Sequence, residues 1–150
     1  MNKYLGLDVG TKTLGLSISL SGIIASPLET LRFEEYNYQV PINYVKELIK
    51  KHKITDVVIG FPKHMNNDLS KTSEISIIYK NKLNHINTHL WDERLSTKTA
   101  YKIMNRNKLS VKKKKKQKDT ISAVIILQNF LNQTNSWGKK SCYTGKYLIN

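Results

Sequence analysis

The stretch that most constrains the fold lies near the N-terminus, where two apolar runs flank a glycine-containing turn. The runs are Tyr4–Leu7 and Leu14–Ile18, and the turn between them holds Asp8, Gly10 and Lys12. Runs of this length on either side of a turn are typical of β-strands. Because burying an unpaired charge is costly, an ionised Asp8 at the edge of a hydrophobic strand needs a cation to meet it. The stretch therefore predicts a strand–turn–strand unit that presents a carboxylate.

Apolar patterning along the rest of the chain predicts an α/β fold, a mixed sheet with helices on both faces. Ser21-Gly22 predicts a turn into a third strand from Ile23, so that residues 3–32 should form three short antiparallel strands. The β-branched runs Ile54–Gly60 and Ile86–Trp91 lack helical spacing and predict further, buried strands. Helices are expected from Pro41 to about Lys53, from about Leu69 to Leu83, from Ser96 or Thr97 to about Asn107 and from Asp119 to Leu131, with a basic loop at residues 108–118. Hairpin strands followed by strand–helix units give this architecture.

Length and charge limit the class of protein. The 150 residues fit one domain, which we place at residues 1–133, followed by a C-terminal tail at 134–150. The net charge of +14 predicts an anionic partner such as nucleic acid, although an AT-rich genome would also enrich Lys, Asn and Ile. No apolar run approaches the roughly 20 residues of a spanning helix, so no membrane partner is expected. Lys3 and Asp8 interrupt the only N-terminal apolar stretch, and Cys142 is the single cysteine; both observations favour a cytoplasmic protein without disulfides.

Four of the 11 acidic residues fall at positions where chemistry is expected. Asp8 follows the first strand, Asp92 and Glu93 end a later strand, and Asp119 opens a buried helix. Each has an ordinary structural alternative: a turn cap for Asp8, pairing with Arg94 for the strand-end acids, and a helix N-cap for Asp119. In open α/β sheets, sites form outside strand ends, where these carboxylates could converge. They would repel one another unless a divalent cation held them, and oxygen ligands favour Mg²⁺ or Mn²⁺ over zinc.

Four segments together resemble the signature blocks of a known family. They read LGLDVGTKTLGLSIS, VVIGFPKHMNN, LWDERLSTKTA and KDTISAVIILQNFL, and they cover residues 3 to about 132 in order. These blocks resemble the YqgF family of RuvC-like nucleases, which are described as Holliday-junction resolvases or pre-16S rRNA nucleases. Thr13-Leu14 and the stretch His64–Asp68 depart from the usual pattern, and the tail after Gln133 is not covered.

The resemblance implies a ribonuclease H-like fold and a metal-dependent nuclease. It implies catalytic, metal-binding acids at Asp8, Glu93 and Asp119, with Asp92 as an alternative ligand. Asp8 would then bridge two ions about 4 Å apart, and Glu93 and Asp119 would each complete one coordination shell. The expected reaction is hydrolysis of phosphodiester bonds at the 5′ end of pre-16S rRNA. Resolution of branched DNA, which would favour a homodimer over a monomer, and nucleic-acid binding without catalysis remain the alternatives.

Basic residues beside these acids are expected to contact phosphate. Lys12 lies in the glycine turn, where it either neutralises phosphate or is simply solvated, and Arg94 either clamps phosphate or pairs with Asp92. The lysine-rich stretch before Asp119 is either a solvated run or a source of salt-sensitive affinity for any nucleic-acid backbone. Its candidate residues are Lys112, Lys113, Lys114, Lys115, Lys116 and Lys118.

Overall fold

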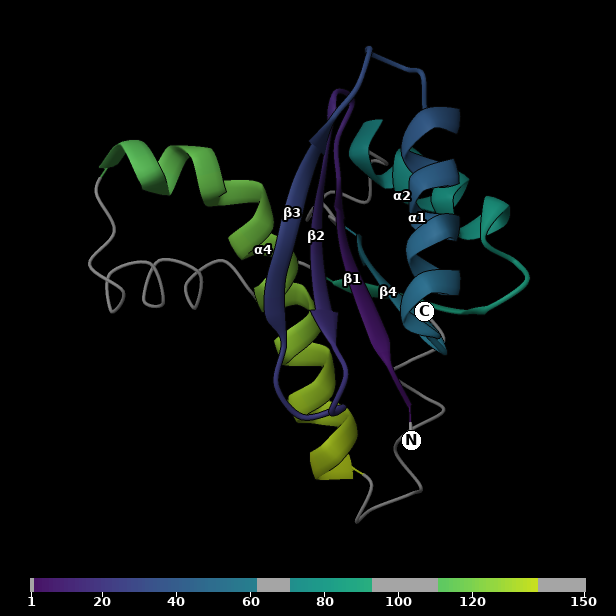
Figure 1. The fold of residues 1–150 in the computed structure, drawn as a ribbon, viewed down its shortest axis with the longest axis vertical. Helices are drawn as coiled ribbons and strands as arrows, with labels where there is room; N and C mark the ends of the chain where they lie inside the picture. Colours follow the sequence, from purple (N-terminus) through teal and green to yellow (C-terminus); the bar gives the residue numbers. More distant parts are fainter. Residues whose placement is uncertain (1, 62–70, 93–110, 138–150) are drawn as a thin grey trace.

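A five-stranded mixed sheet forms the centre of the molecule (Figure 1). The computed structural model describes residues 2–61, 71–92 and 111–137, with side chains at 2–61, 73–92 and 120–135. The strand order is β3-β2-β1-β4-β5; β1 pairs antiparallel with β2 and parallel with β4, and β4 pairs parallel with β5. The strands are β1 (Tyr4–Val9), β2 (Thr13–Ser19), β3 (Ser26–Arg32), β4 (Asp56–Phe61) and β5 (Asn87–Asp92). The predicted mixed sheet is confirmed, with the first strand at its centre.

The third strand begins later than predicted. Ile23 to Ala25 form a loop, and β3 starts at Ser26. The reason is that side chains capture the backbone groups a strand would need: Ser21 Oγ accepts the N–H of Ile23 at 3.1 Å, and Gln128 Oε1 accepts the N–H of Ala25 at 2.9 Å. A hydrogen bond from a residue 103 positions away could not be read from local sequence.

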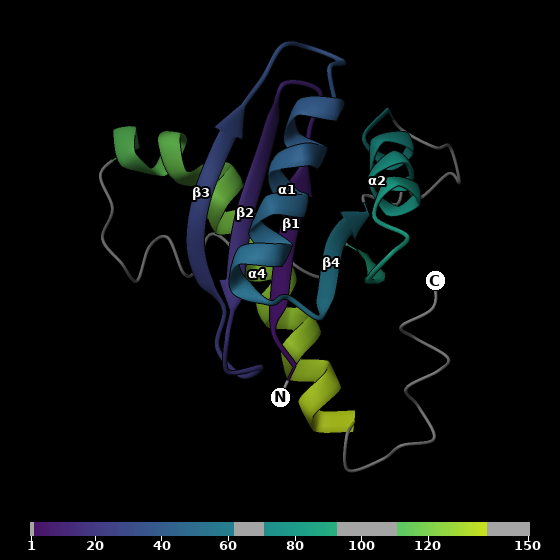
Figure 2. The same ribbon diagram turned by 45° about the vertical axis from the view of Figure 1, so that its right-hand side comes forward.

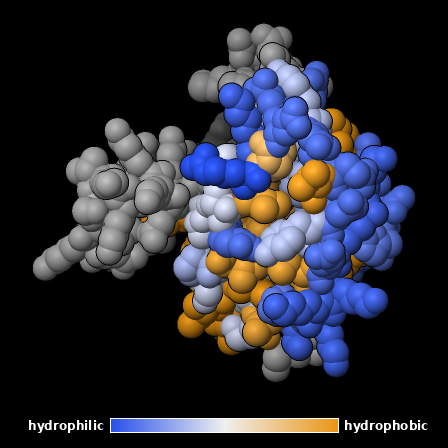
Figure 3. Space-filling model, turned by 45° about the horizontal axis from the view of Figure 1, so that its top comes forward, coloured by the Kyte–Doolittle hydropathy of each residue, from blue (hydrophilic) through white to orange (hydrophobic). Residues whose placement is uncertain are grey.

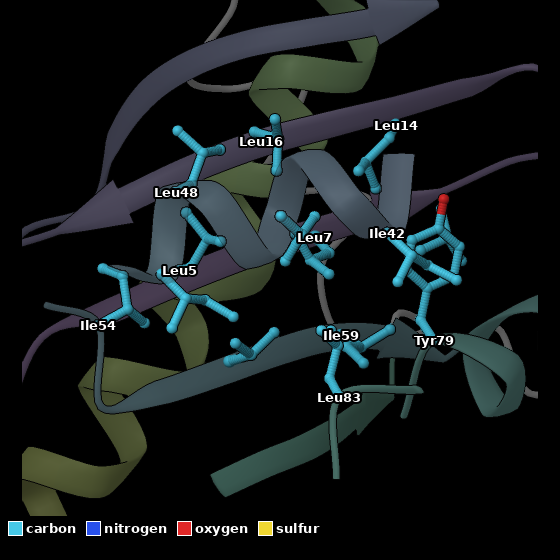
Figure 4. Close-up of a cluster of buried hydrophobic side chains, with 14 of the residues drawn as sticks. Leu5, Leu7, Leu14, Leu16, Ile42, Leu48, Ile54, Ile59, Tyr79 and Leu83 are labelled. Atoms are coloured by element: carbon cyan, nitrogen blue, oxygen red, sulfur yellow. The ribbon is translucent and has the colours of Figure 1, made fainter. Parts of the chain in front are cut away.

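Helices α1 (Gln39–His52) and α2 (Lys71–Lys82) lie on one side of the sheet (Figures 1 and 2). Alternate residues of β1 and β2 point to this side because successive strand residues face opposite ways. They form a cluster with apolar residues of α1 and α2, part of which Figure 4 shows. Its fully buried members include Leu5, Leu7, Leu14, Leu16, Val45, Ile59, Tyr79 and Leu83.

Helix α4 (Val111–Trp137) lies on the opposite side of the sheet (Figures 1 and 2). The predicted loop at 108–118 is therefore wrong from residue 111 onward, and Asp119 lies inside the helix rather than capping it. Lysine is a good helix former, and no Gly or Pro interrupts the sequence between Val111 and Trp137. The helix also passes the predicted end at Leu131, so the proposed domain boundary at residue 133 falls within it.

The apolar part of α4 forms a second core with the sheet. Ile126, Leu127 and Phe130 pack with Tyr4 of β1 and Trp91 of β5. The predicted helix from Ser96 or Thr97 to about Asn107 lies outside the described residues. In the helices that the structure describes, no segment is long and apolar enough to cross a membrane.

Candidate active site

The Asp8 carboxylate lies on the side of the sheet that α4 covers. Leu7 and Val9, its neighbours in β1, belong to the core under α1. Gly6 faces α4, since a Cβ at this position would overlap Ser17 Oγ and lie 2.8 Å from the Cβ of Leu127. Asp8, two residues further along the strand, shares the face of Gly6. It is partly exposed.

A single cross-strand row connects Asp8 with helix α4. Asp8 pairs with Gly15 of β2, and Gly15 pairs with Thr30 of β3. The Oγ1 atoms of Thr30 and Thr120 are hydrogen-bonded, so residue 120 of α4 sits over this row. Since neighbouring strands are about 4.8 Å apart, Asp8 and Thr30 are separated by about 10 Å across the sheet. Gly15 contributes no side chain between them.

The direction of α4 places its earlier residues toward the Asp8 end of β1. The ring of Tyr4 lies 5.9 Å from that of Phe130, and Gly6, further along β1, faces Leu127 and Ala123. Residues of β1 that lie closer to Asp8 thus contact residues that lie closer to the start of α4. Ser17 Oγ fixes this alignment by donating a hydrogen bond of 2.7 Å to the carbonyl oxygen of Ala123.

The two faces of β5 separate Asp92 from Asp8. Trp91 faces α4, where its ring centroid lies 5.8 Å from that of Phe130, whereas Leu90 packs against the core under α1. Asp92, in register with Phe61 of β4, shares the face of Leu90. Asp92 and Asp8 therefore lie near the same edge of the parallel strands but on opposite faces of the sheet.

The other predicted site residues are only partly within the described structure. Glu93 and Arg94 lie outside it. Asp119 and the predicted lysines at 112–116 and 118 are helical residues of α4 whose side chains are not described. Across the described side chains, no group of three or more His, Cys, Asp and Glu could hold a metal ion. Two of the three acids expected to do so are not among those side chains.

Lys12 is accessible beside the site. Its Nζ lies 3.9 Å from Glu35 Oε2, and the two side chains are 67% and 43% exposed. Exposed pairs of this kind contribute only ~0–1 kcal/mol, so pairing with Glu35 does not prevent Lys12 from contacting an anion. The backbone of the turn is fixed by a hydrogen bond of 2.9 Å from the N–H of Gly10 to the carbonyl oxygen of Thr13.

Sequence reasoning missed an aromatic segment that packs against this turn. Residues 33–38, which join β3 to α1 and which we call the aromatic loop, contain Phe33, Tyr36 and Tyr38. The N–H of Phe33 donates to the carbonyl oxygen of Lys12 at 3.0 Å. Burial raises the pKa of Tyr38, and the nearby Tyr36 and Glu35 raise it further. The sequence offered a signal in the density of aromatic residues, but nothing in it placed them beside Lys12.

Three comparisons identify the relatives of this chain. Residues 2–133 match the RuvX family, described as Holliday junction resolvase. A candidate pre-16S rRNA nuclease of Aster yellows witches'-broom phytoplasma (strain AYWB) is 42% identical over 135 residues, which make up 87% of this chain and 89% of the relative. A candidate pre-16S rRNA nuclease of Staphylococcus aureus (strain N315) is 43% identical over 136 residues, which make up 87% of this chain and 96% of the relative.

The fold is similar to that of solved RuvC structures. Thermus thermophilus RuvC in complex with a Holliday junction substrate superposes with a TM-score of 0.60 and 15% identity, over 91% of this chain and 97% of that one. A second T. thermophilus RuvC structure gives a TM-score of 0.53 over 89% and 96% of the two chains. At these identities the likeness concerns the fold alone. The chain is a member of the RuvX (YqgF) family with a RuvC-like ribonuclease H fold.

Proposed function

We propose that this protein is a metal-dependent nuclease that hydrolyses phosphodiester bonds in the 5′ leader of precursor 16S rRNA. Family membership and the names of its 42–43% identical relatives support the reaction and the substrate. The observation that carries the proposal is the cross-strand row that puts Asp8 at the level of residue 120 of α4, on the same face of the sheet. This arrangement supports a site shared by the central strand and the helix.

Asp8, Glu93 and Asp119 are the proposed catalytic acids. Asp119 directly precedes Thr120, which lies over the row that contains Asp8. Glu93 is proposed over Asp92 as the third acid, because Asp92 shares the face of Leu90, which is opposite to that of Asp8. Asp92 stays the alternative ligand.

The donor set fits Mg²⁺ or Mn²⁺, since all its proposed ligands are carboxylate oxygens. When bound, Mg²⁺ supplies a Lewis acid and lowers the pKa of a coordinated water, in either a one-ion or the proposed two-ion form. Asp8 is held in place by pairing of β1 on both sides, antiparallel to β2 and parallel to β4. Lys12, in the turn that follows, would bind and orient the substrate phosphate.

A cleavage assay with Asp8→Asn tests the proposal. Purified protein is incubated in the presence of Mg²⁺ or Mn²⁺ with one of two substrates, tested side by side. One substrate is a precursor 16S rRNA leader and the other is a four-way DNA junction. The wild-type protein is expected to cut the leader, and Asp8→Asn should slow cleavage at least about a hundredfold because the charge is removed where it acts. Glu47→Gln, which removes a carboxylate from an exposed position of α1, is the matched control and should leave the rate unchanged.

Three results would contradict parts of the proposal. Cleavage that survives Asp8→Asn would rule out this site. Cleavage of the junction but not of the leader would identify a branched-DNA resolvase instead. Binding of either nucleic acid without any cleavage by the wild type would leave a non-catalytic binding protein.

A further inference from the structure

Tyr36 in the aromatic loop is an exposed ring in an unfavourable backbone conformation. The residue is 57% exposed, and its φ angle is +68°. Only glycine adopts this region without steric cost, and a bulky residue there is uncommon. An exposed tyrosine contributes little to a core, so folding alone does not explain its presence at such a position.

The surrounding backbone holds Tyr36 in this conformation. Its N–H donates to the carbonyl oxygen of Thr11 at 3.2 Å, and the N–H of Asn37 donates to the carbonyl oxygen of Glu34 at 2.9 Å. The first of these bonds ties the aromatic loop to the turn that begins two residues after Asp8. Figure 1 shows the β3–α1 connection and the β1–β2 turn at the same end of the sheet.

The ring of Tyr36 also takes part in a series of aromatic contacts that leads to the core. Tyr36 lies edge-to-face against Tyr38, with ring centroids 6.5 Å apart and planes at 82°. Tyr38 in turn contacts Phe33 at 6.0 Å and the fully buried Tyr79 at 6.2 Å. The exposed ring is therefore the outer end of a series of aromatic contacts that reaches the core.

Charge at this end of the molecule is mixed, because the aromatic loop carries Glu34 and Glu35, and Lys12 Nζ lies 3.9 Å from Glu35 Oε2. Lys12 is on the turn that the aromatic loop contacts, and it is 67% exposed. Figure 3, in which the top of the molecule comes forward, shows hydrophilic side chains over much of this face with apolar surface between them. Single-stranded nucleic acid is bound by exposed aromatic rings together with nearby cations, with the base on the ring and the phosphate on the cation. Tyr36 and Lys12 offer this pair of groups, because the loop of the first is hydrogen-bonded to the turn of the second.

We propose that Tyr36 is a stacking platform for an unpaired base of the substrate strand, at the end of the sheet where Asp8 lies. The inference rests on the proposed function, because it deepens that site by naming an unpaired segment as the part of the substrate it binds. Every base has a π-face, so the contact would be tolerant of sequence. It would favour a substrate whose strand is unpaired next to the bond that is cut.

The test separates the ring from the backbone at residue 36. Tyr36→Gly removes the ring and relieves the positive φ, whereas Tyr36→Phe keeps the ring. Binding is measured in EDTA, so that no cleavage occurs, with a short single-stranded oligoribonucleotide that contains 2-aminopurine, whose fluorescence is quenched by stacking. We expect Tyr36→Gly to lose the binding-induced quenching and to bind about 5- to 100-fold more weakly, with an unchanged or higher Tm. Tyr36→Phe should behave as wild type.

Two controls make the result specific. Ile24→Ala truncates a side chain of a residue that is 66% exposed in the β2–β3 loop, away from the aromatic loop, and should change neither quenching nor affinity. A fully paired RNA duplex offers no free base face, so Tyr36→Gly should bind it as wild type does. Wild-type quenching and affinity in Tyr36→Gly, or an equal weakening on duplex and single strand, would overturn the stacking proposal.

The cleavage assay distinguishes this proposal from the proposed function. Ring-dependent quenching by a wild-type protein that cuts nothing would overturn the nuclease and retain the stacking platform. If the wild type cleaves normally with Mg²⁺, and Tyr36→Gly matches it in both the binding and the cleavage assay, the nuclease is retained and the stacking platform is overturned.

Discussion

The hydroxyl of Tyr79 lacks a hydrogen-bond partner, although its oxygen is buried, as far as the described part of the chain shows. Burial also raises the pKa of this group. A buried polar group without a partner costs ~1–3 kcal/mol, so Tyr79→Phe should raise the free energy of unfolding by ~1 kcal/mol in urea denaturation. Tyr44→Phe is the matched control, because the Tyr44 hydroxyl donates to Glu29 and removing it should lower stability. Equal destabilisation by both changes would show that Tyr79 has a partner.

Asp56 makes stability depend on acid pH. Burial alone would raise the pKa of Asp56. The pKa is nevertheless held below its ordinary value of 3.8, because the carboxylate accepts hydrogen bonds from His89, Thr55 and Asn87 and lies near the charge of His89. A carboxyl whose folded pKa is depressed contributes stability above its unfolded pKa and loses it as pH falls through the folded value. The stability difference between wild type and Asp56→Asn should therefore narrow as pH drops below about 4. Urea denaturation at several pH values measures it; a difference that widens there would contradict the assignment.

At the scale of elements, the position of α4 depends on the absence of a side chain at Gly6. A Cβ there would lie 2.8 Å from the Cβ of Leu127 and 3.0 Å from the carbonyl oxygen of Ala123, both in α4. Because the helix would have to move off the sheet, Gly6→Ala should lower the free energy of unfolding by ~2–3 kcal/mol. Nuclease activity should fall with it, since α4 carries Asp119, one of the proposed catalytic acids.

Gly22→Ala provides the comparison for Gly6→Ala. Gly22 has φ +77° but no atom closer than 3.6 Å to an added Cβ, so only the backbone conformation opposes the change. The cost should be ~1 kcal/mol, and activity should be unaffected. Thermal unfolding and the cleavage assay separate the two variants. A Gly6→Ala protein as stable as wild type would show that α4 is not so closely packed.

The elements that the sequence predicted are those whose signal is local. Apolar alternation and glycine turns predicted β1 and β2, and the β-branched runs predicted β4 and β5. The start of α4 was missed because a lysine run reads equally as a solvated loop or a helix, and tertiary contacts decide between them. The sequence alone could not show that Asp8 and Asp92 lie on opposite faces of the sheet. That depends on which residues of β5 face α4, and the packing of Trp91 against Phe130 decides it.

At the scale of the whole molecule, α4 has two parts with different properties, one buried and one rich in lysine. From Thr120 to Leu131 it is mostly buried against the sheet. Residues 111–118 carry six lysines, and Figure 1 shows these first turns reaching beyond the sheet beside β3. Since Thr120 lies over the row that contains Asp8, the basic part begins where the candidate site is. The helix thus links the core, the candidate site and a large share of the net charge of +14.

This arrangement predicts how salt controls binding. Replacing Lys112–Lys116 with Gln should weaken binding to all nucleic-acid sequences alike, because lysines release counterions from phosphates without reading bases. The slope of log Kd against log salt concentration should become shallower by about 0.7 for each phosphate of a single strand that the variant no longer neutralises. Replacing five exposed lysines on the side of the sheet that α1 and α2 cover with Gln is the charge control; they are Lys46, Lys50, Lys51, Lys53 and Lys82. Salt titrations that change equally for both sets would show that the protein attracts nucleic acid by its overall charge and not through the start of α4.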